Sequence, residues 1–424
     1  MPILSRLATG WVLCILGSEV AQAANYPLNT TCSPPPTSGG KGYCGPSICD
    51  TVTNTAKTCV FTSQTFNYAT LVSKVKSKTC TQSTDARCTS AALKALMKGQ
   101  GIKAAYCNDA FLVIISDGST GFSNYLSSIH NPPGSVGSDG VACVTRTTNP
   151  SYSTVKIPLY PTLLATSDPS TNNVNTNSYP NGAGDANGAY MSATTRNTGA
   201  TYGLPTRGAV GITIGGQEIF PAFNNLAYLA PQKCEVDTCQ EHVGGGGGQP
   251  HLHGDPFGTW CLYSALDYAS SSVHPPQIGW AFDGPSIYGR HLSTGNAGYL
   301  TPLDNCGGHV HAGYAYHYHA QVLTAFTDFG AYPGKAAGQA YYASTTGPYK
   351  CLKGDISLIP NYFGNMLASH VSVLPDTTTY ICTGSTKYYT AVGITLPNTA
   401  STSMAAPKST TVSAPIIIKG KVSS

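Results

Sequence analysis

Four histidines lie within eleven positions of the stretch GGHVHAGYAYHYHA, residues 307–320, in a chain that has only 11 histidines among its 424 residues. Imidazole nitrogens are typical ligands of copper and zinc. A concentration of this kind therefore predicts a transition-metal site. Hydrogen-bonded histidines in a polar sheet are the alternative interpretation, and for an isolated His-x-His it is the better one.

Strand geometry explains how these four side chains can meet. Residues two apart on a strand share a face, so His317 and His319 should project together. In a hairpin about Tyr314, His309 would face His319. His311 would likewise face His317, and Cβ atoms about 5 Å apart would allow the imidazoles to converge on one ion.

The chain repeats this pattern about 67 residues earlier. VGITIGGQEIFP (210–221) aligns with IGWAFDGPSIYG (278–289), and both segments have the glycines and apolar runs of a β-hairpin. VDTCQEHVGGGGGQPHLH (236–253) aligns with LDNCGGHVHAGYAYHYH (303–319), and both end in His-x-His. Histidines that recur at matched spacing favour the metal interpretation over the structural one.

The predicted fold is mainly β, with tandem-duplicated antiparallel β-hairpin units that form one β domain about a pseudo-twofold axis. The repeats span 205–255 and 273–321. The two histidine clusters would form either two equivalent sites or one shared centre. The predicted metal ligands are His242, His251, His253, His309, His311, His317 and His319, with Asp255 as an oxygen ligand.

Several other residues are weaker candidates. Asp283 and Gly284 are most simply a turn pair. Cys239 and Cys306 could be soft ligands, although disulfide bonding is the stronger expectation. Asp237 and Asp304 would either orient a ligand imidazole or cap the hairpin. The remaining lone histidines are expected to be satisfied by hydrogen bonds, and they are His130, His274, His291 and His370.

The ends of the chain indicate export. Residues 1–23 have a short basic region, an apolar run and a small-residue cleavage site, which is typical of a secretory signal peptide. No later stretch has the roughly 18 apolar residues of a membrane span, and we expect no membrane anchor. Asn29 begins the only glycosylation sequon. Residues 386–424 have the composition of a disordered tail.

The cysteines agree with export, since removal of Cys14 leaves an even number in an oxidising compartment. Residues 24–109 form a small Cys-rich segment with a short helix after Asp85 that stops at Gly99. The number of cysteines in this segment is odd, so at least one bridge should leave it, with Cys143 as a candidate partner. Residues 110–385 contain the repeats.

Composition excludes some classes of function. The formal net charge is +4, and no Lys or Arg run interleaves with aromatic residues, so nucleic acid is not an expected partner. The chain has no Gly-x-Ser-x-Gly elbow, phosphate-binding loop or His-Glu-x-x-His helix, which are the familiar signatures of hydrolases and nucleotide-binding proteins.

The segments IGWAFDGPSIYG, LDNCGGHVHAGYAYHYH and YKCLKG resemble the conserved segments of the YHYH domain family, whose tetrapeptide stands here at residues 316–319. The resemblance covers roughly residues 110–385. The first repeat departs from it, because QPHLHGDP keeps the histidines and replaces the tyrosines. The resemblance implies a secreted or surface β protein and does not supply a reaction.

Three functions therefore stay open. The first is a secreted metal-binding domain with copper or zinc that catalyses a redox or hydrolytic reaction, with tyrosines 314, 316 and 318 assisting electron or proton transfer. The second is a non-catalytic extracellular or cell-wall protein with structural or metal-buffering histidines. The third is a polysaccharide-binding protein. A small molecule or a cell-wall component is the expected partner.

Overall fold

The computed structural model describes discontinuous parts of the chain. They are residues 75–99, 101–118, 129–130, 143–144, 153–165, 193–194, 201–202, 204, 208–223, 230, 236, 240–244, 249–256, 262–263, 274–290, 301–311, 313–322, 346–354 and 380–390. The predicted signal peptide, the sequon at Asn29, Asp237, Cys239, His291 and His370 lie outside these ranges. So does the end of the predicted tail, from 391 onward.

The described residues are mainly β, as the sequence predicts. The two repeats together form one eight-stranded sheet with the order β11-β12-β10-β9-β13-β14-β16-β15. Its strands are β9 (Gly211–Thr213), β10 (Glu218–Ile219), β11 (Glu241–His242), β12 (His251–Leu252), β13 (Gln277–Ala281), β14 (Ser286–Tyr288), β15 (Gly308–His311) and β16 (Tyr314–His319).

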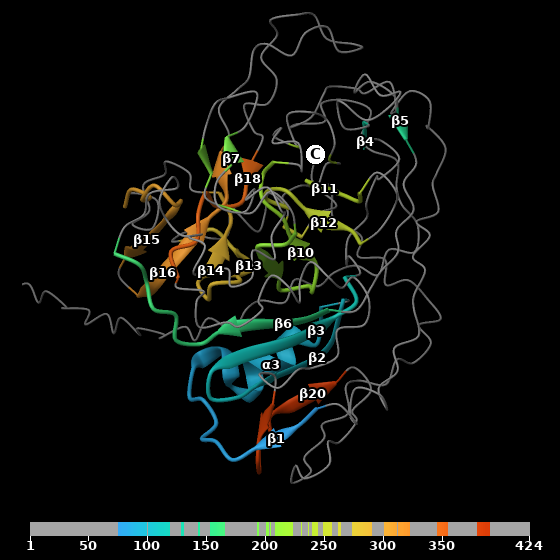
Figure 1. The fold of residues 1–424 in the computed structure, drawn as a ribbon, viewed down its shortest axis with the longest axis vertical. Coiled ribbons are helices and arrows are strands. Elements are labelled where there is room, and N and C mark those ends of the chain that lie inside the picture. Colours follow the sequence, from blue (N-terminus) through green and yellow to red (C-terminus); the bar gives the residue numbers. More distant parts are fainter. Residues whose placement is uncertain are drawn as a thin grey trace, which may run out of the picture.

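The strand order has the symmetry that the repeat predicts. Reading outward from the centre, the first repeat contributes β9, β10, β12 and β11, and the second contributes β13, β14, β16 and β15. Each half combines antiparallel hairpins with one parallel pair, β10 with β12 or β14 with β16. Figure 1 shows β11 and β12 on one side of the central strands and β15 and β16 on the other.

The two halves meet where β9 and β13 pair in antiparallel fashion. Ile212 lies opposite Trp280, with the pair Gly211 and Ala281 on one side and the pair Thr213 and Gly279 on the other. A two-fold rotation about the Ile212–Trp280 pair exchanges these flanking pairs, because the offset of 68 residues converts 211 into 279 and 213 into 281. This pair therefore marks the pseudo-twofold axis.

A four-stranded antiparallel sheet lies beside the repeats (Figure 1). Its order is β20 (Tyr388–Thr390), β2 (Ile102–Cys107), β3 (Phe111–Ser116) and β6 (Ser153–Pro158). Leu112 and Ile114 of β3 join the core of the repeats, whereas Val113 and Ile115 pack with Tyr388 on the opposite face. This alternation explains why β3 is apolar throughout.

The predicted helix is present as two pieces. The side chain of Asp85 caps a 3-10 turn, η1 (Ala86–Cys88), and accepts a hydrogen bond from the backbone of Arg87. Thr89 then caps α3 (Ser90–Leu96) through the backbone of Ala92. The sequence predicts one continuous helix after Asp85. In the structure Asp85 caps the 3-10 turn η1, and the α-helix α3 begins after it with its own cap.

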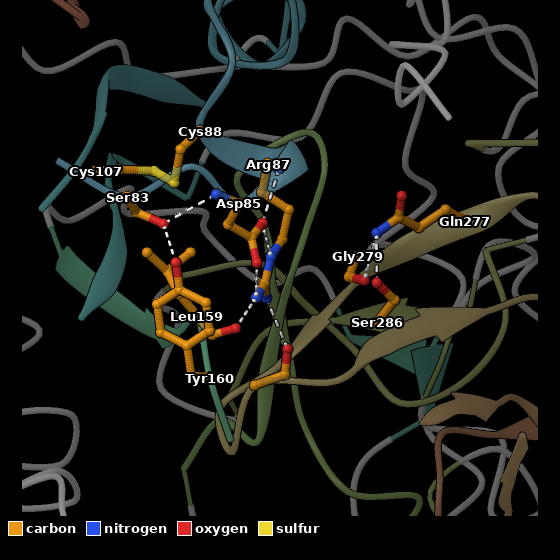
Figure 2. A network of polar contacts seen from close by, with 11 residues as sticks. Ser83, Asp85, Arg87, Cys88, Cys107, Leu159, Tyr160, Gln277, Gly279 and Ser286 are labelled. Atoms are coloured by element: carbon orange, nitrogen blue, oxygen red, sulfur yellow. Dashed lines mark hydrogen bonds and ion pairs between the residues drawn. A yellow bond between two sulfur atoms is a disulfide. The ribbon is translucent and has the colours of Figure 1, made fainter. Parts of the chain in front are cut away.

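Both central hairpin turns contact the four-stranded sheet. Gly215 of the β9–β10 turn accepts a hydrogen bond from the backbone of Gly101 at 3.0 Å. In the second repeat, Gly284 accepts one from Arg87 at 3.0 Å, and the same guanidinium donates to Leu159 at 2.7 Å (Figure 2). Both central turns are therefore hydrogen-bonded to residues beside the four-stranded sheet, Gly101 just before β2 and Arg87 on η1.

Three disulfides lie within the described residues, in agreement with the predicted disulfide bonding. Cys88 pairs with Cys107, Cys306 pairs with Cys351, and Cys80 pairs with Cys382 across 302 positions of sequence. The last bridge leaves the Cys-rich segment, as the odd cysteine count requires, but its partner is Cys382 instead of Cys143. Cys306 is accordingly a disulfide cysteine and not a thiolate ligand.

The structure differs from the predicted segment boundaries. The boundary at 109/110 falls inside the hairpin of β2 and β3, so the Cys-rich segment shares a sheet with residues of the next segment. The predicted tail begins at 386, yet β20 pairs with β2 over residues 388–390. The pairing of β2 with β20 joins residues far apart in the sequence, and β20 has only 3 residues, which is too short to stand out in the sequence.

The remaining described strands form two-stranded pairs. They are β1 (Ser77–Lys78) with β19 (Ile381–Cys382), β4 (Ile129–His130) with β5 (Cys143–Val144), β7 (Ala193–Thr194) with β8 (Thr201–Tyr202), and β17 (Gln321–Val322) with β18 (Thr346–Gly347). No helix in the described part of the chain combines the length and apolar character that a membrane span requires.

Candidate metal centres

The first histidine cluster consists of His242, His251 and His253. His242 on β11 lies directly opposite His251 on β12, and His253 follows at the end of β12. The ring centroids are 4.5 to 5.1 Å apart, and one nitrogen of each ring lies within 4.8 Å of the others. All three side chains are buried. The cluster can hold a metal ion.

The second cluster repeats this arrangement at the other end of the sheet. His309 on β15 lies opposite His317 on β16, and His319 ends β16. The centroids of these three rings are 4.7 to 5.1 Å apart. His309, His317 and His319 are therefore the counterparts of His242, His251 and His253. The clusters are two separate groups, one in each half of the sheet.

The predicted register of the second hairpin was wrong. His309 pairs with His317 and not with His319, and His311 pairs with Tyr314 and not with His317. The register shifts between His309 and His311, and Gly313 has a φ of 85°, which is typical of a tight turn. Despite this shift, the rings of all four histidines still gather on one side.

Backbone carbonyl groups fix the ring orientations in both clusters. His253 donates from Nδ1 to Pro221, and its counterpart His319 donates to Gly289, which is 68 residues after Pro221. His251 and His317 each donate from Nδ1 to the carbonyl two residues earlier, at 3.0 and 2.7 Å. The carbonyl oxygen can only accept, so these four rings carry their proton on Nδ1.

The second cluster contains two further histidines. The Nε2 atom of His274 lies 2.9 Å from Nε2 of His317, and its Nδ1 donates to the carbonyl of Pro275. The rings of His311 and His274 have centroids 5.2 Å apart. Nitrogens of His274, His309, His311 and His317 all lie within 4.8 Å of one another.

Facing nitrogens in the second cluster carry lone pairs and not protons. Nε2 of His309 lies 3.0 Å from Nε2 of His319, while Nδ1 of His309 donates to Thr301 and Nδ1 of His319 donates to Gly289. A neutral imidazole has only one N–H group, so neither Nε2 can donate to the other. Two nitrogen ligands that each lie about 2.1 Å from one ion would be separated from each other by a distance close to the 3.0 Å between these two Nε2 atoms.

Burial keeps these imidazoles neutral. Burial, helped by the neighbouring rings of His274, His309 and His311, lowers the pKa of His317 to about 3, although the hydrogen bond to Ala315 opposes this shift. Burial likewise lowers the pKa of His319 far below its ordinary value. A proton is therefore a poor way to relieve the repulsion between the facing lone pairs, and a metal cation is a good one.

Sequence reasoning did not identify His274 as a cluster residue. It lies just before β13, 35 positions before His309, and its repeat-related positions are Thr206 or Arg207. Neither a His-x-His pattern nor the repeat marks it. Only the fold of the β13–β14 hairpin against β16 brings it to His317.

Aromatic rings surround both clusters. Phe220 stacks on His251 with centroids 3.9 Å apart, and its counterpart Tyr288 contacts His317 edge-on at 5.0 Å. Tyr314 stacks on His274 at 4.3 Å. These rings pack against the imidazoles and restrict their rotation.

The tyrosines of the YHYH tetrapeptide face away from the histidines. Tyr316 donates a hydrogen bond to Asp304, and Tyr318 donates one to Asp283 at 2.6 Å. Asp283 also accepts from the backbone of Gly354 at 2.7 Å. The tetrapeptide therefore places two imidazoles on one face of β16. On the other face it places two hydroxyl groups that form hydrogen bonds with Asp304 and Asp283.

The predicted oxygen ligand Asp255 is not part of the first cluster. Its carboxylate forms an ion pair with Arg290 of the second repeat, with Nε and Oδ2 2.9 Å apart. The buried carboxylate of Asp255 is compensated by this guanidinium, and the ion pair takes Asp255 away from the histidines. The sequence around Asp255 does not reveal a partner from the other repeat.

The remaining candidates have structural roles in the described residues. Asp304 accepts hydrogen bonds from the backbone of Cys306 and Gly308, so it caps the turn before β15. Asp283 and Gly284 form the β13–β14 turn, in which Gly284 has a φ of 114°. His130 lies on β4.

Comparisons with protein-family models, with curated proteins and with solved structures gave no match to this chain. The chemistry of the two clusters therefore rests on their geometry.

Proposed function

We propose that this chain is a secreted metal-binding protein of the YHYH type, whose two histidine clusters hold copper or zinc. The observation that carries the proposal is the pair of Nε2 atoms of His309 and His319, 3.0 Å apart, with both Nδ1 atoms engaged by backbone carbonyl groups. Ligand histidines in metalloproteins are oriented in this way by their second nitrogen.

The ligand chemistry supports copper or zinc over ions that prefer oxygen. Each group of nitrogens in the described residues consists of imidazoles alone. Imidazole suits zinc, copper, nickel and iron, whereas magnesium, calcium and manganese prefer oxygen ligands. Cys306 is held in a disulfide with Cys351, so it offers no thiolate to the second cluster.

Export is supported by the signal-peptide pattern of residues 1–23 together with the three disulfides. Membership of the YHYH family is proposed from the motifs of the sequence alone. Histidine and tyrosine alternate at 316–319 because one face of β16 carries the metal ligands. The other face carries the tyrosine hydroxyl groups that donate to Asp304 and Asp283.

A small molecule can approach the second cluster more readily than the first. His242, His251 and His253 are at most 8% exposed, whereas His311 and Tyr314 are partly exposed and the neighbouring Val310 is 58% exposed. A redox or hydrolytic reaction would therefore take place at the second cluster, and the first is the better candidate for a structural ion. Tyr314 would assist this reaction, and Tyr316 and Tyr318 would not.

Nitrogen-15 NMR of histidine-labelled protein, titrated with zinc(II), tests the proposal. The metal-free protein should show Nδ1-protonated neutral imidazoles. Zinc should shift the Nε2 resonances of His253 and His319 and leave the Nδ1–H signals in place. Nε2 resonances that do not move at a stoichiometric excess of zinc would contradict metal binding by these rings.

A further inference from the structure

The second cluster is larger than the first. It contains the counterparts of the three histidines of the first cluster and adds His274 and His311. His274 has no histidine counterpart, because the repeat places Thr206 or Arg207 at its position, and His311 is replaced by Gly244 in the first repeat. Two equal copies of one unit thus carry unequal numbers of imidazoles.

The extra histidines create a second pair of facing nitrogens. Nε2 of His274 lies 2.9 Å from Nε2 of His317, just as Nε2 of His309 lies 3.0 Å from that of His319. All four rings donate from Nδ1 to a backbone carbonyl, belonging to Pro275, Ala315, Thr301 and Gly289. Each pair therefore points two lone pairs at a common space.

One ion cannot take the nitrogens of all five histidines. Ligands about 2.1 Å from a common ion lie at most about 4.2 Å from one another. His319 is not in the group of His274, His309, His311 and His317, whose nitrogens are mutually within 4.8 Å, although its Nε2 lies 3.0 Å from that of His309. The second cluster therefore offers more imidazoles than one ion can take, and the two facing pairs are the candidate positions for two ions.

These positions are adjacent. The rings of His309 and His317 have centroids 4.7 Å apart, and those of His274 and His319 are 4.9 Å apart. Two-metal sites in proteins hold their ions about 3.5 to 4 Å apart. His311 lies beside both pairs, and its buried Nε2 has no hydrogen-bond partner among the described residues.

We propose that the second cluster is a dinuclear site, in which one ion lies between His309 and His319 and the other lies between His274 and His317, with His311 as an additional ligand. The first cluster holds a single ion through His242, His251 and His253. This inference rests on the proposed metal-binding function and specifies its stoichiometry as three ions per chain. Substrates that bridge two metal ions, such as dioxygen or a small oxyanion, suit such a site.

The test uses copper(II) alone on full-length, tag-free protein, with copper measured by mass spectrometry and unpaired spins measured by electron paramagnetic resonance. Three copper ions per chain are expected. Only the ion of the first cluster should give the signal of an isolated copper(II), and the other two should lose intensity through coupling or give a half-field transition.

Two matched variants assign the signals. His274→Gln should lose one copper ion and the coupled signal, and leave two isolated ions. His251→Gln should lose the isolated ion and keep the coupled pair. If His274→Gln does not fold, the copper content and spin count of the wild-type protein still decide whether the second cluster holds two coupled ions.

Two copper ions per chain, or three that all give isolated signals, would overturn the dinuclear site and leave the proposed function intact. Protein that binds no copper, and no zinc in a parallel dialysis, would overturn both.

Discussion

Ile212 lies directly opposite Trp280 at the centre of the eight-stranded sheet. This pair lies at the centre of the junction between the two repeats, because β9 and β13 are the strands at which the halves meet. Both side chains are buried in one core that contains residues of the repeats and of the four-stranded sheet. The histidine clusters are therefore held by a common scaffold and should not survive as separately folded halves.

Close backbone contact at the central pair predicts a large effect of Gly279→Ala. A Cβ atom at Gly279 would collide with the carbonyl oxygen of Ile212, which is part of the β9 backbone and cannot move aside. The free energy of unfolding should fall by more than about 3 kcal/mol. Urea denaturation of the metal-free protein measures it.

Gly313→Ala is the matched control for this substitution. A Cβ atom at Gly313 has open space around it, and the only cost is the positive φ of 85°. The expected loss is about 1 to 2 kcal/mol. Equal losses for the two variants would argue against tight pairing of β9 with β13.

Tyr318→Phe tests whether the two faces of β16 have separate roles. Tyr318 donates to buried Asp283 and accepts a hydrogen bond from the backbone of Lys353. Loss of the hydroxyl should lower the free energy of unfolding by about 2 kcal/mol. Metal stoichiometry should stay unchanged, because the hydroxyl lies on the face opposite to His317 and His319. A variant that folds and yet loses metal would contradict this division of roles.

Asp283 should make stability depend on pH. Burial raises its pKa to about 6 from an ordinary value of 3.8, although hydrogen bonds from Tyr318, Gly354 and Lys353 oppose this shift. Below pH 3.8 the carboxyl is protonated in both states. Between pH 3.8 and 6 the unfolded chain releases the proton first, so this group lowers the free energy of unfolding as the pH rises.

Asp283→Asn removes this titration. The difference in the free energy of unfolding between wild type and variant should therefore change by about 3 kcal/mol from acid to neutral pH. The wild type becomes less stable relative to the variant as the pH rises. Denaturation curves in a chelator, recorded across that range, measure it. A difference that is constant with pH would show that Asp283 titrates normally in the folded protein.

The two clusters should lose metal independently. Their ligands come from different strand pairs, β11 with β12 and β15 with β16. His253→Ala should weaken metal binding at the first cluster by at least about 100-fold and leave the second unchanged, and His319→Ala should do the reverse. His370→Ala, which changes a lone histidine outside the described residues, should have no effect. Isothermal titration with zinc distinguishes the two affinities, and a variant that weakens both would indicate one shared centre.

Much of this architecture could be predicted from the sequence because it depends on local periodicity. The alternation of His317 and His319 with Tyr316 and Tyr318 predicts two faces of one strand, and both faces are present. The 68-residue offset predicts two equivalent hairpins, and Ile212 opposite Trp280 is the symmetric contact between them.

The rest depends on tertiary structure that the sequence does not encode locally. His274 reaches the second cluster only because the segment before β13 folds against β16, and no repeat or spacing marks it. Asp255 is taken by Arg290, a partner from the other repeat. The register of β15 with β16 depends on an irregularity between His309 and His311 that alternation alone cannot predict.

Metal binding by the two clusters is tested most directly by the metal content of tag-free protein after equilibrium dialysis against micromolar copper or zinc. We predict retained metal in both halves of the chain, lost from the first half in His253→Ala and reduced in the second half in His319→Ala. Wild-type protein that leaves dialysis free of both metals would contradict metal binding, and the facing nitrogens of His309 and His319 would then need another explanation.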